Sequence, residues 1–268
     1  MKSDKIINNF KKRFKKVKKH YHKLFGDFAT EEIHGFRLEM KKLRAFIRLI
    51  NTNTPKKKKI KIGRKIKSLY NTTGNIRNLQ LHQQRVGHLC DEMLLKMPVQ
   101  YMQLLYKEEN KQKKKAGQRA DKISFKHFRR KINVFAPHKL NTESLEGIVL
   151  HKQRALIALI FLENYSDEAL HKIRKFLKDL TYNWKYINSY LPAALPAYCT
   201  NKKNIAFITD KIGEFHDLCI ALYFLKPVYL NKIVEKEEQK ILLNVKRKLV
   251  MNKGEMKKEI NTLLNYKA

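Results

Sequence analysis

Five side chains that can carry a positive charge recur along one short stretch of the chain, and together they could bind an anion. They are His34, Arg37, Lys41, Arg44 and Arg48, separated by alternating steps of three and four residues. On a helix this spacing puts all five on one stripe. Arginine offers forked hydrogen-bond donors to phosphate oxygens, lysine offers a point charge, and histidine can donate even when neutral. The pattern therefore favours phosphate binding.

The helix that positions this row should span residues 31–50, with its apolar seam directly beside the row. Each cation follows a seam residue by one position, which is about 100° around a helix. Like charges about one turn apart repel one another, so the row is poorly suited to stabilising the fold. Leu38, Phe46 and Leu49 make the other flanks apolar, which indicates that the row lines a groove. In the alternative interpretation, the cations merely cover apolar neighbours with their stems. The seam consists of Ile33, Phe36, Met40, Leu43, Ile47 and Ile50.

The same pattern recurs in residues 169–187, which predicts a duplicated helical unit. His171, Arg174, Lys178 and Lys185 repeat the row, while Thr181 stands where Arg44 would predict a base. A second pair of similar segments, GNIRNLQL from residue 74 and GEFHDLCI from residue 213, keeps the same order. A single histidine on a helix is more often structural than functional, but the shared register favours a binding role for both histidines.

The spacing of breakers and apolar residues predicts an all-α protein. The chain of 268 residues has nine glycines and six prolines and few alternating β-branched runs. Helices are expected near residues 4–25, 56–73, 75–96 and 98–133, in addition to the two above. Thr30 is expected to cap the helix at 31–50. A break that contains Pro137 divides the chain into halves, 1–137 and 138–268, of a single domain.

The charge of the chain predicts a polyanionic partner. Lys and Arg total 59 against 24 Asp and Glu, which gives a formal net charge of +35. Nucleic acid, an anionic membrane surface and inorganic polyphosphate all remain open on charge alone. The chain has no run of about 18 apolar residues and no signal-peptide pattern, so we expect a cytoplasmic protein without membrane insertion. Cys90, Cys199 and Cys219 are far apart, so we expect small core residues and no metal site or cofactor.

At these residues the sequence resembles the CHAD family, the conserved histidine α-helical domain. IHGFRLEMKKLRAFIRL and LHKIRKFLKDLTYNWKY match its histidine helix, and the segments at Gly74 and Gly213 resemble its second signature, a G-x-x-R-D type turn into a helix. The resemblance implies two antiparallel helical bundles related by a pseudo-twofold axis around a basic central groove. It also implies non-catalytic binding of inorganic polyphosphate, and polyphosphate granules as a candidate location within the cytoplasm.

The second signature departs from the family pattern in both copies. The first copy keeps Arg77 but has Asn78 in place of the acid, and the second keeps Asp217 but has His216 in place of the base. We therefore expect Arg77 and Asp217 to be structural. The expected polyphosphate-binding residues are His34, Arg37, Lys41, Arg44, Arg48, His171, Arg174, Lys175, Lys178 and Lys185, and Arg64, Lys67 and Lys203 are candidates for an extension of the groove.

Two other classes of function remain as alternatives. The first is binding of structured RNA, which the charge and the 10% aromatic content support, although no zinc-finger, RRM or KH signature is present. Nucleic acid would in any case compete as a polyanion. The second is an enzyme that acts on polyphosphate or triphosphate. Such chemistry uses carboxylates that hold a divalent metal, and the sequence has neither an E-x-E-x-K strand nor a P-loop.

Overall fold

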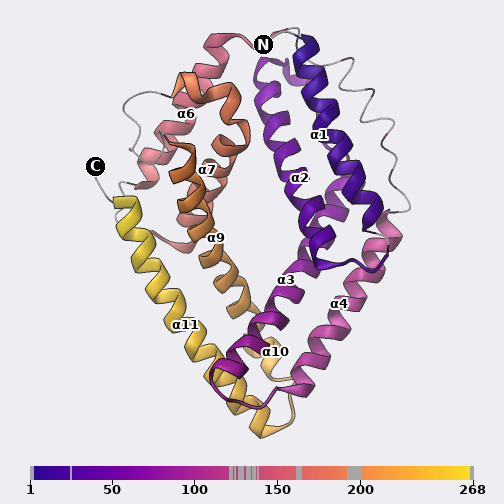
Figure 1. Ribbon diagram of the computed structural model, residues 1–268, viewed down its shortest axis with the longest axis vertical. Helices are drawn as coiled ribbons and strands as arrows, with labels where there is room; N and C mark the ends of the chain where they lie inside the picture. The colour runs from indigo at the N-terminus through magenta and orange to yellow at the C-terminus, as the bar shows by residue number, and fades with distance from the viewer. Residues whose placement is uncertain are drawn as a thin grey trace.

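The computed structural model describes residues 3–24, 26–120, 123, 125, 130, 134, 137, 139–160, 165–191 and 201–265, and these form helices and connecting turns (Figure 1). The all-α prediction is confirmed. The helices are α1 (Ser3–Lys23), α2 (Thr30–Ile50), α3 (Arg64–Glu92), α4 (Val99–Ala120), α6 (Thr142–Ile160), α7 (Asp167–Ile187), α9 (Lys202–Phe224), α10 (Pro227–Leu230) and α11 (Lys236–Asn265), with short 3₁₀ turns η1 (Asn51–Asn53), η2 (Lys56–Lys58) and η3 (Asn188–Tyr190).

Apolar seams at helical spacing hold these elements together. All six seam residues of α2 are buried, and so are the matching positions of α7 except Trp184, which is half-buried. α1 contributes a buried face of Ile6, Phe10, Phe14, Val17, Tyr21 and Leu24. Burial of such a face is the main source of helix stability in a folded protein.

The helices follow the same order of neighbours in the two parts of the chain. α2 packs against α1 and α3, and α3 packs against α4; α7 packs against α6 and α9, and α9 packs against α11. Across the molecule, α2 contacts α7 and α3 contacts α9. Figure 1 shows α1, α2 and α4 on the right and α6, α7 and α11 on the left, while α3 and α9 converge towards the bottom of the view. The two row-bearing helices, α2 and α7, are therefore neighbours.

Several expected boundaries are wrong. Residues 64–92 form one helix instead of two helices separated at Gly74, and residues 56–58 form only a 3₁₀ turn. The single helix expected over 98–133 is not formed, because α4 covers Val99–Ala120 and Ile123 is not helical; much of 121–133 lies outside the described residues. Thr30 is not the cap of α2: Ala29 occupies that position, and Thr30 Oγ1 donates to Gln80 Oε1 at 3.1 Å.

The remaining general expectations concern cysteines and membranes. Cys90 is buried and Cys219 is half-buried, as expected for small core residues, while Cys199 lies outside the described residues. A search of the described helices finds none with the length and apolar character needed to cross a membrane.

Candidate functional site

The predicted row on α2 lies at the boundary between the core and the surface. His34 and Arg48, at its two ends, are exposed, while Arg37, Lys41 and Arg44 are half-buried. The geometry follows from the seam, because a residue one position after a buried residue lies beside it on the helix.

Arg37 is held by the backbone of α3. Its Nη1 donates to Tyr70 O at 2.6 Å, and its guanidinium carbon lies 4.6 Å from the centre of the Tyr70 ring. Gly74 allows this approach, because a Cβ at that position would overlap the guanidinium group. Burial lowers the pKa of Arg37, although an arginine remains charged under ordinary conditions.

Arg174 makes the corresponding contact in the second copy. Its Nε donates to Thr209 O on α9 at 3.3 Å, and a Cβ on Gly213 would lie 2.9 Å from its Nη2. The two glycine-led segments are therefore not turns, as their resemblance to the G-x-x-R-D type turn had implied. They lie inside α3 and α9, where each glycine leaves room for an arginine from the histidine helix.

Lys41 lies where the two rows come together. Its pKa is lowered to about 8, chiefly by burial and then by the positive charges of Arg37 on its own helix and of Arg174 and Lys178 on α7. Asp217, on α9, acts in the opposite direction. Such charge effects require short separations. We refer to Arg37, Lys41, Arg174 and Lys178 as the central cluster.

The predicted histidines lie beside this cluster. Burial lowers the pKa of His34, and Arg77 contributes to the shift. His171 and His216 lie with their ring centres 4.9 Å apart, and burial lowers the pKa of both. Arg174 and Lys41 also lower the pKa of His216. The sequence interpretation did not include His216 among the site residues, although it stands in the same segment as Asp217.

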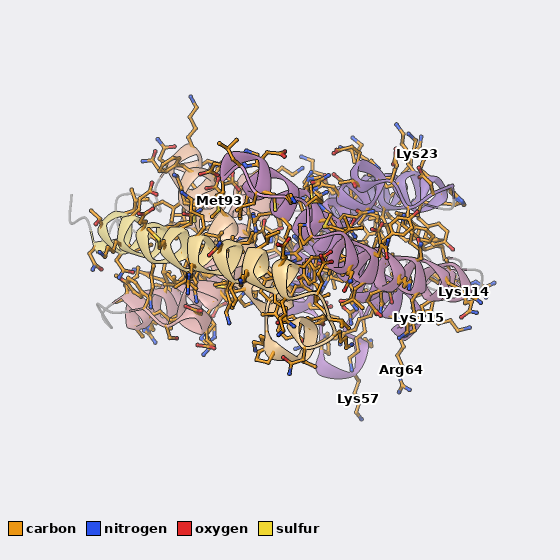
Figure 2. All side chains as sticks on the ribbon, turned by 90° about the horizontal axis from the view of Figure 1, so that it is seen from below. Lys23, Lys57, Arg64, Met93, Lys114 and Lys115 are labelled. Atoms are coloured by element: carbon orange, nitrogen blue, oxygen red, sulfur yellow. The ribbon has the colours of Figure 1, made fainter. Side chains whose placement is uncertain are left out.

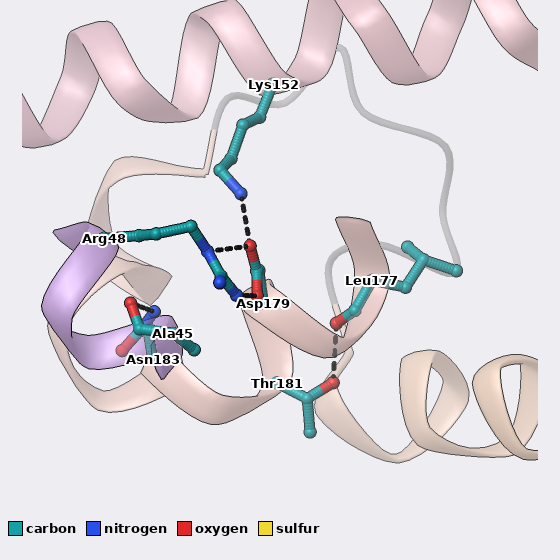
Figure 3. Close-up of polar contacts among 7 residues, drawn as sticks. All are labelled: Ala45, Arg48, Lys152, Leu177, Asp179, Thr181 and Asn183. Atoms are coloured by element: carbon teal, nitrogen blue, oxygen red, sulfur yellow. Dashed lines mark hydrogen bonds and ion pairs between the residues drawn. The ribbon is translucent and has the colours of Figure 1, made fainter. Parts of the chain in front are cut away.

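Acidic side chains engage two members of the rows. Figure 3 shows a bidentate ion pair between Arg48 and Asp179 on α7. The Nε of Arg48 donates to Oδ2 at 3.0 Å, and its Nη2 donates to Oδ1. Lys152, on α6, also donates to Asp179 at 3.0 Å. Lys178 pairs with Asp210 at 2.8 Å. The sequence interpretation missed both acids.

The remaining predicted residues of the two rows differ in their contacts and exposure. Arg44 lies with its guanidinium carbon 5.1 Å from the centre of the Tyr70 ring. Lys185 donates to Asn9 Oδ1 at 3.0 Å. Lys175 is exposed on α7. At the interrupted position of the second row, Thr181 Oγ1 donates back to Leu177 O at 2.9 Å, as Figure 3 shows.

Arg77 and Asp217 approach each other from the two parts of the chain. Burial lowers the pKa of Arg77, and the carboxylates of Glu31 and Asp217 raise it. The Nη1 of Arg77 is buried and finds no hydrogen-bond partner in the described part of the chain. Asp217 also contributes its backbone oxygen, which accepts a hydrogen bond from Arg85 Nη1 at 2.8 Å.

The three candidates for an extension of the groove have different positions. Lys67 lines a cavity of about 260 Å³ together with Arg44, Arg48 and Lys61. Figure 2 shows Arg64 extending away from the ribbon, as Lys57, Lys114 and Lys115 do. Lys203 is exposed in the first turn of α9. A search of the described residues for metal-binding groups of three or more His, Cys, Asp or Glu side chains finds none.

Comparisons with known proteins agree on one family. A family model for the CHAD domain matches residues 9–226. Among solved structures, a CHAD domain from the plant Ricinus communis superposes with a TM-score of 0.70 at 12% sequence identity, covering 98% of this chain and 91% of that chain. At this identity the structural match establishes the fold alone. A search of curated proteins finds no match.

Proposed function

Since the chain belongs to the CHAD domain family, we propose that it binds inorganic polyphosphate along the rows of α2 and α7. The observation that carries this proposal is the central cluster, in which the charges of Arg174 and Lys178 on α7 act on Lys41 of the adjoining α2. A flexible chain with about one negative charge per phosphate could contact donors on both helices at once.

The electrostatics of the cluster favour a polyanion. The four cations of the central cluster lie in partly buried positions, where desolvation and mutual repulsion raise the free energy of the folded state. The lowered pKa of Lys41 has the same two causes. A bound phosphate chain would replace repulsion with charge-assisted hydrogen bonds. Each such bond contributes about 1.5–3 kcal/mol, so affinity depends on how many form together.

The aromatic residue beside the α2 row favours polyphosphate over RNA. A protein that binds single-stranded RNA commonly stacks bases on exposed aromatic rings. The ring of Tyr70 already lies close to the guanidinium groups of Arg37 and Arg44, at 4.6 and 5.1 Å. A ligand without bases has no need of that ring.

We further propose binding without chemistry on the ligand, in the cytoplasm. The groups that gather around Lys41 are chiefly donors and cations, which suit retention of phosphate oxygens. Incubation of the protein with polyphosphate and Mg²⁺ or Mn²⁺ tests this point. Accumulation of free phosphate in proportion to protein concentration would contradict it.

Competition between polyanions tests the choice of ligand. Labelled RNA bound to the protein should be displaced by long-chain polyphosphate at a much lower phosphate concentration than is needed for the reverse exchange. Lys41→Met should weaken polyphosphate binding by about tenfold or more, since it removes one charged donor. Lys42→Met is the matched control, because Lys42 is engaged with Glu39 at 2.8 Å. Preferential binding of RNA, or equal effects of the two variants, would contradict the proposal.

A further inference from the structure

A second cavity lies apart from the central cluster, where α2, α6 and α7 meet. Its volume is about 420 Å³, within the range of about 300–1,000 Å³ typical of small-molecule sites. Most of its wall is apolar. The apolar side chains come from all three helices: Ala45 and Leu49 on α2, Ile148 and Val149 on α6, and Leu180 and Ile187 on α7.

The polar part of the lining carries an excess of positive charge. Arg48 and Lys152 share the single carboxylate of Asp179, as Figure 3 shows, and His151 stands beside Lys152 in the chain. One carboxylate against two permanent cations leaves a net positive charge. Arg48 and Lys152 each retain donors beyond those that Asp179 accepts, because a guanidinium has five N–H groups and an ammonium has three.

Asn183 on α7 links this helix to α2 in the wall of the cavity. Its side chain is 5% exposed, and its Nδ2 donates to Ala45 O at 3.1 Å. Among the described residues, its Oδ1 is buried and has no hydrogen-bond partner.

We propose that this cavity binds a medium-chain fatty acid. The hydrocarbon chain lies against the apolar wall, and the carboxylate accepts hydrogen bonds from Arg48 and Lys152. Polyphosphate has no apolar part to match the wall, and a neutral hydrocarbon leaves the positive charge without a partner. An aliphatic chain with one anionic end matches both parts of the cavity. Arg48 belongs both to the α2 row and to the lining of this cavity, whereas the described lining contains no member of the central cluster.

A glycine on α6 allows the cavity to be filled without disturbing the core. Gly147 lines the cavity, and a Cβ at that position meets open space. Gly147→Leu should therefore fold and should occupy part of the volume. Gly254→Leu on α11 is the matched control, because Gly254 is also helical and exposed, and a Cβ there meets no atom of the described residues within 4 Å.

Isothermal titration with decanoate, below its micellar concentration, provides the test. The wild type and Gly254→Leu should each bind one decanoate, and Gly147→Leu should bind it about tenfold more weakly or not at all. Polyphosphate binding should be the same in all three proteins. Absence of saturable decanoate binding by the wild type, or equal affinity in Gly147→Leu, would overturn the proposal.

A change of charge tests the position of the carboxylate. Lys152→Met should weaken decanoate binding about fivefold or more while leaving decanol binding unchanged, because only the acid has an anionic end. Decanol should also bind the wild type more weakly than decanoate does. Equal affinities for the acid and the alcohol in the wild type would show that Arg48 and Lys152 do not hold the head group, and would contradict this assignment.

Discussion

The lowered pKa of Lys41 predicts that polyphosphate binding is accompanied by proton uptake. In the free protein, burial and the charges of Arg37, Arg174 and Lys178 lower the pKa of Lys41 to about 8. A bound phosphate chain would place negative charge beside the ammonium group and raise that pKa towards its ordinary value. The bound state therefore holds the proton at a pH where the free state has lost most of it. Affinity should be highest below pH 8 and should decline as the pH rises from the pKa of the free state to that of the bound state.

The size of the effect follows from the two pKa values. If binding restores the ordinary pKa of about 10.4, the association constant falls roughly tenfold between about pH 7 and pH 9, and binding near pH 9 takes up about 0.9 proton. The pKa values of His34, His171 and His216 are lowered in the free protein, so these side chains are neutral there in this window. Lys41 is the group whose proton uptake is expected near pH 9.

Isothermal titration calorimetry in two buffers with different ionisation enthalpies measures the proton uptake directly. A long polyphosphate chain keeps the contribution of its terminal groups small. Lys41→Met should abolish the uptake near pH 9, and Lys42→Met should preserve it. Absence of uptake by the wild type, or its persistence in Lys41→Met, would refute the assignment of Lys41 to the binding site.

Three further predictions concern glycine packing, an ion pair and salt. Gly74→Ala should displace Arg37 and weaken polyphosphate binding, measured by titration, about threefold or more. Gly117→Ala is the control, because a Cβ there meets no atom of the described residues within 4 Å. It should leave affinity unchanged and stabilise α4 by about 0.5–1 kcal/mol. Asp179→Asn should lower the free energy of unfolding, measured in urea, by about 1–2 kcal/mol. This value is small because solvent screens the exposed Arg48 side of the ion pair. The same substitution should raise polyphosphate affinity, because it frees Arg48. The logarithm of the association constant should fall linearly with the logarithm of salt concentration, and a salt-independent affinity would contradict an electrostatic site.

The sequence predicts the helices that carry the rows because their apolar seams are long and regular. Ile33 to Ile50 and Leu170 to Ile187 bury as expected, and the residue after each seam position then lies at the edge of the core. Local spacing determines these features. The division into halves at residue 137 and the pseudo-twofold axis remain predictions.

The contacts between distant segments could not be predicted in the same way. In the sequence, Gly74 predicts the end of a helix, yet α3 continues through it. The guanidinium of Arg37 occupies the space where a Cβ would lie, which explains the glycine at this position. Asp179 and Arg48 are far apart in the chain, so their ion pair depends on how α2 packs against α7. The position of Lys41 among cations of α7 likewise depends on that packing.

We propose that the rows of α2 and α7 bind the same polyphosphate chain. Titration of the wild type, Lys41→Met and Lys178→Met with polyphosphate of one defined length tests it most directly. We predict one chain per protein molecule, with affinity reduced by either substitution. Two independent sites, each sensitive to only one of the substitutions, would contradict the claim.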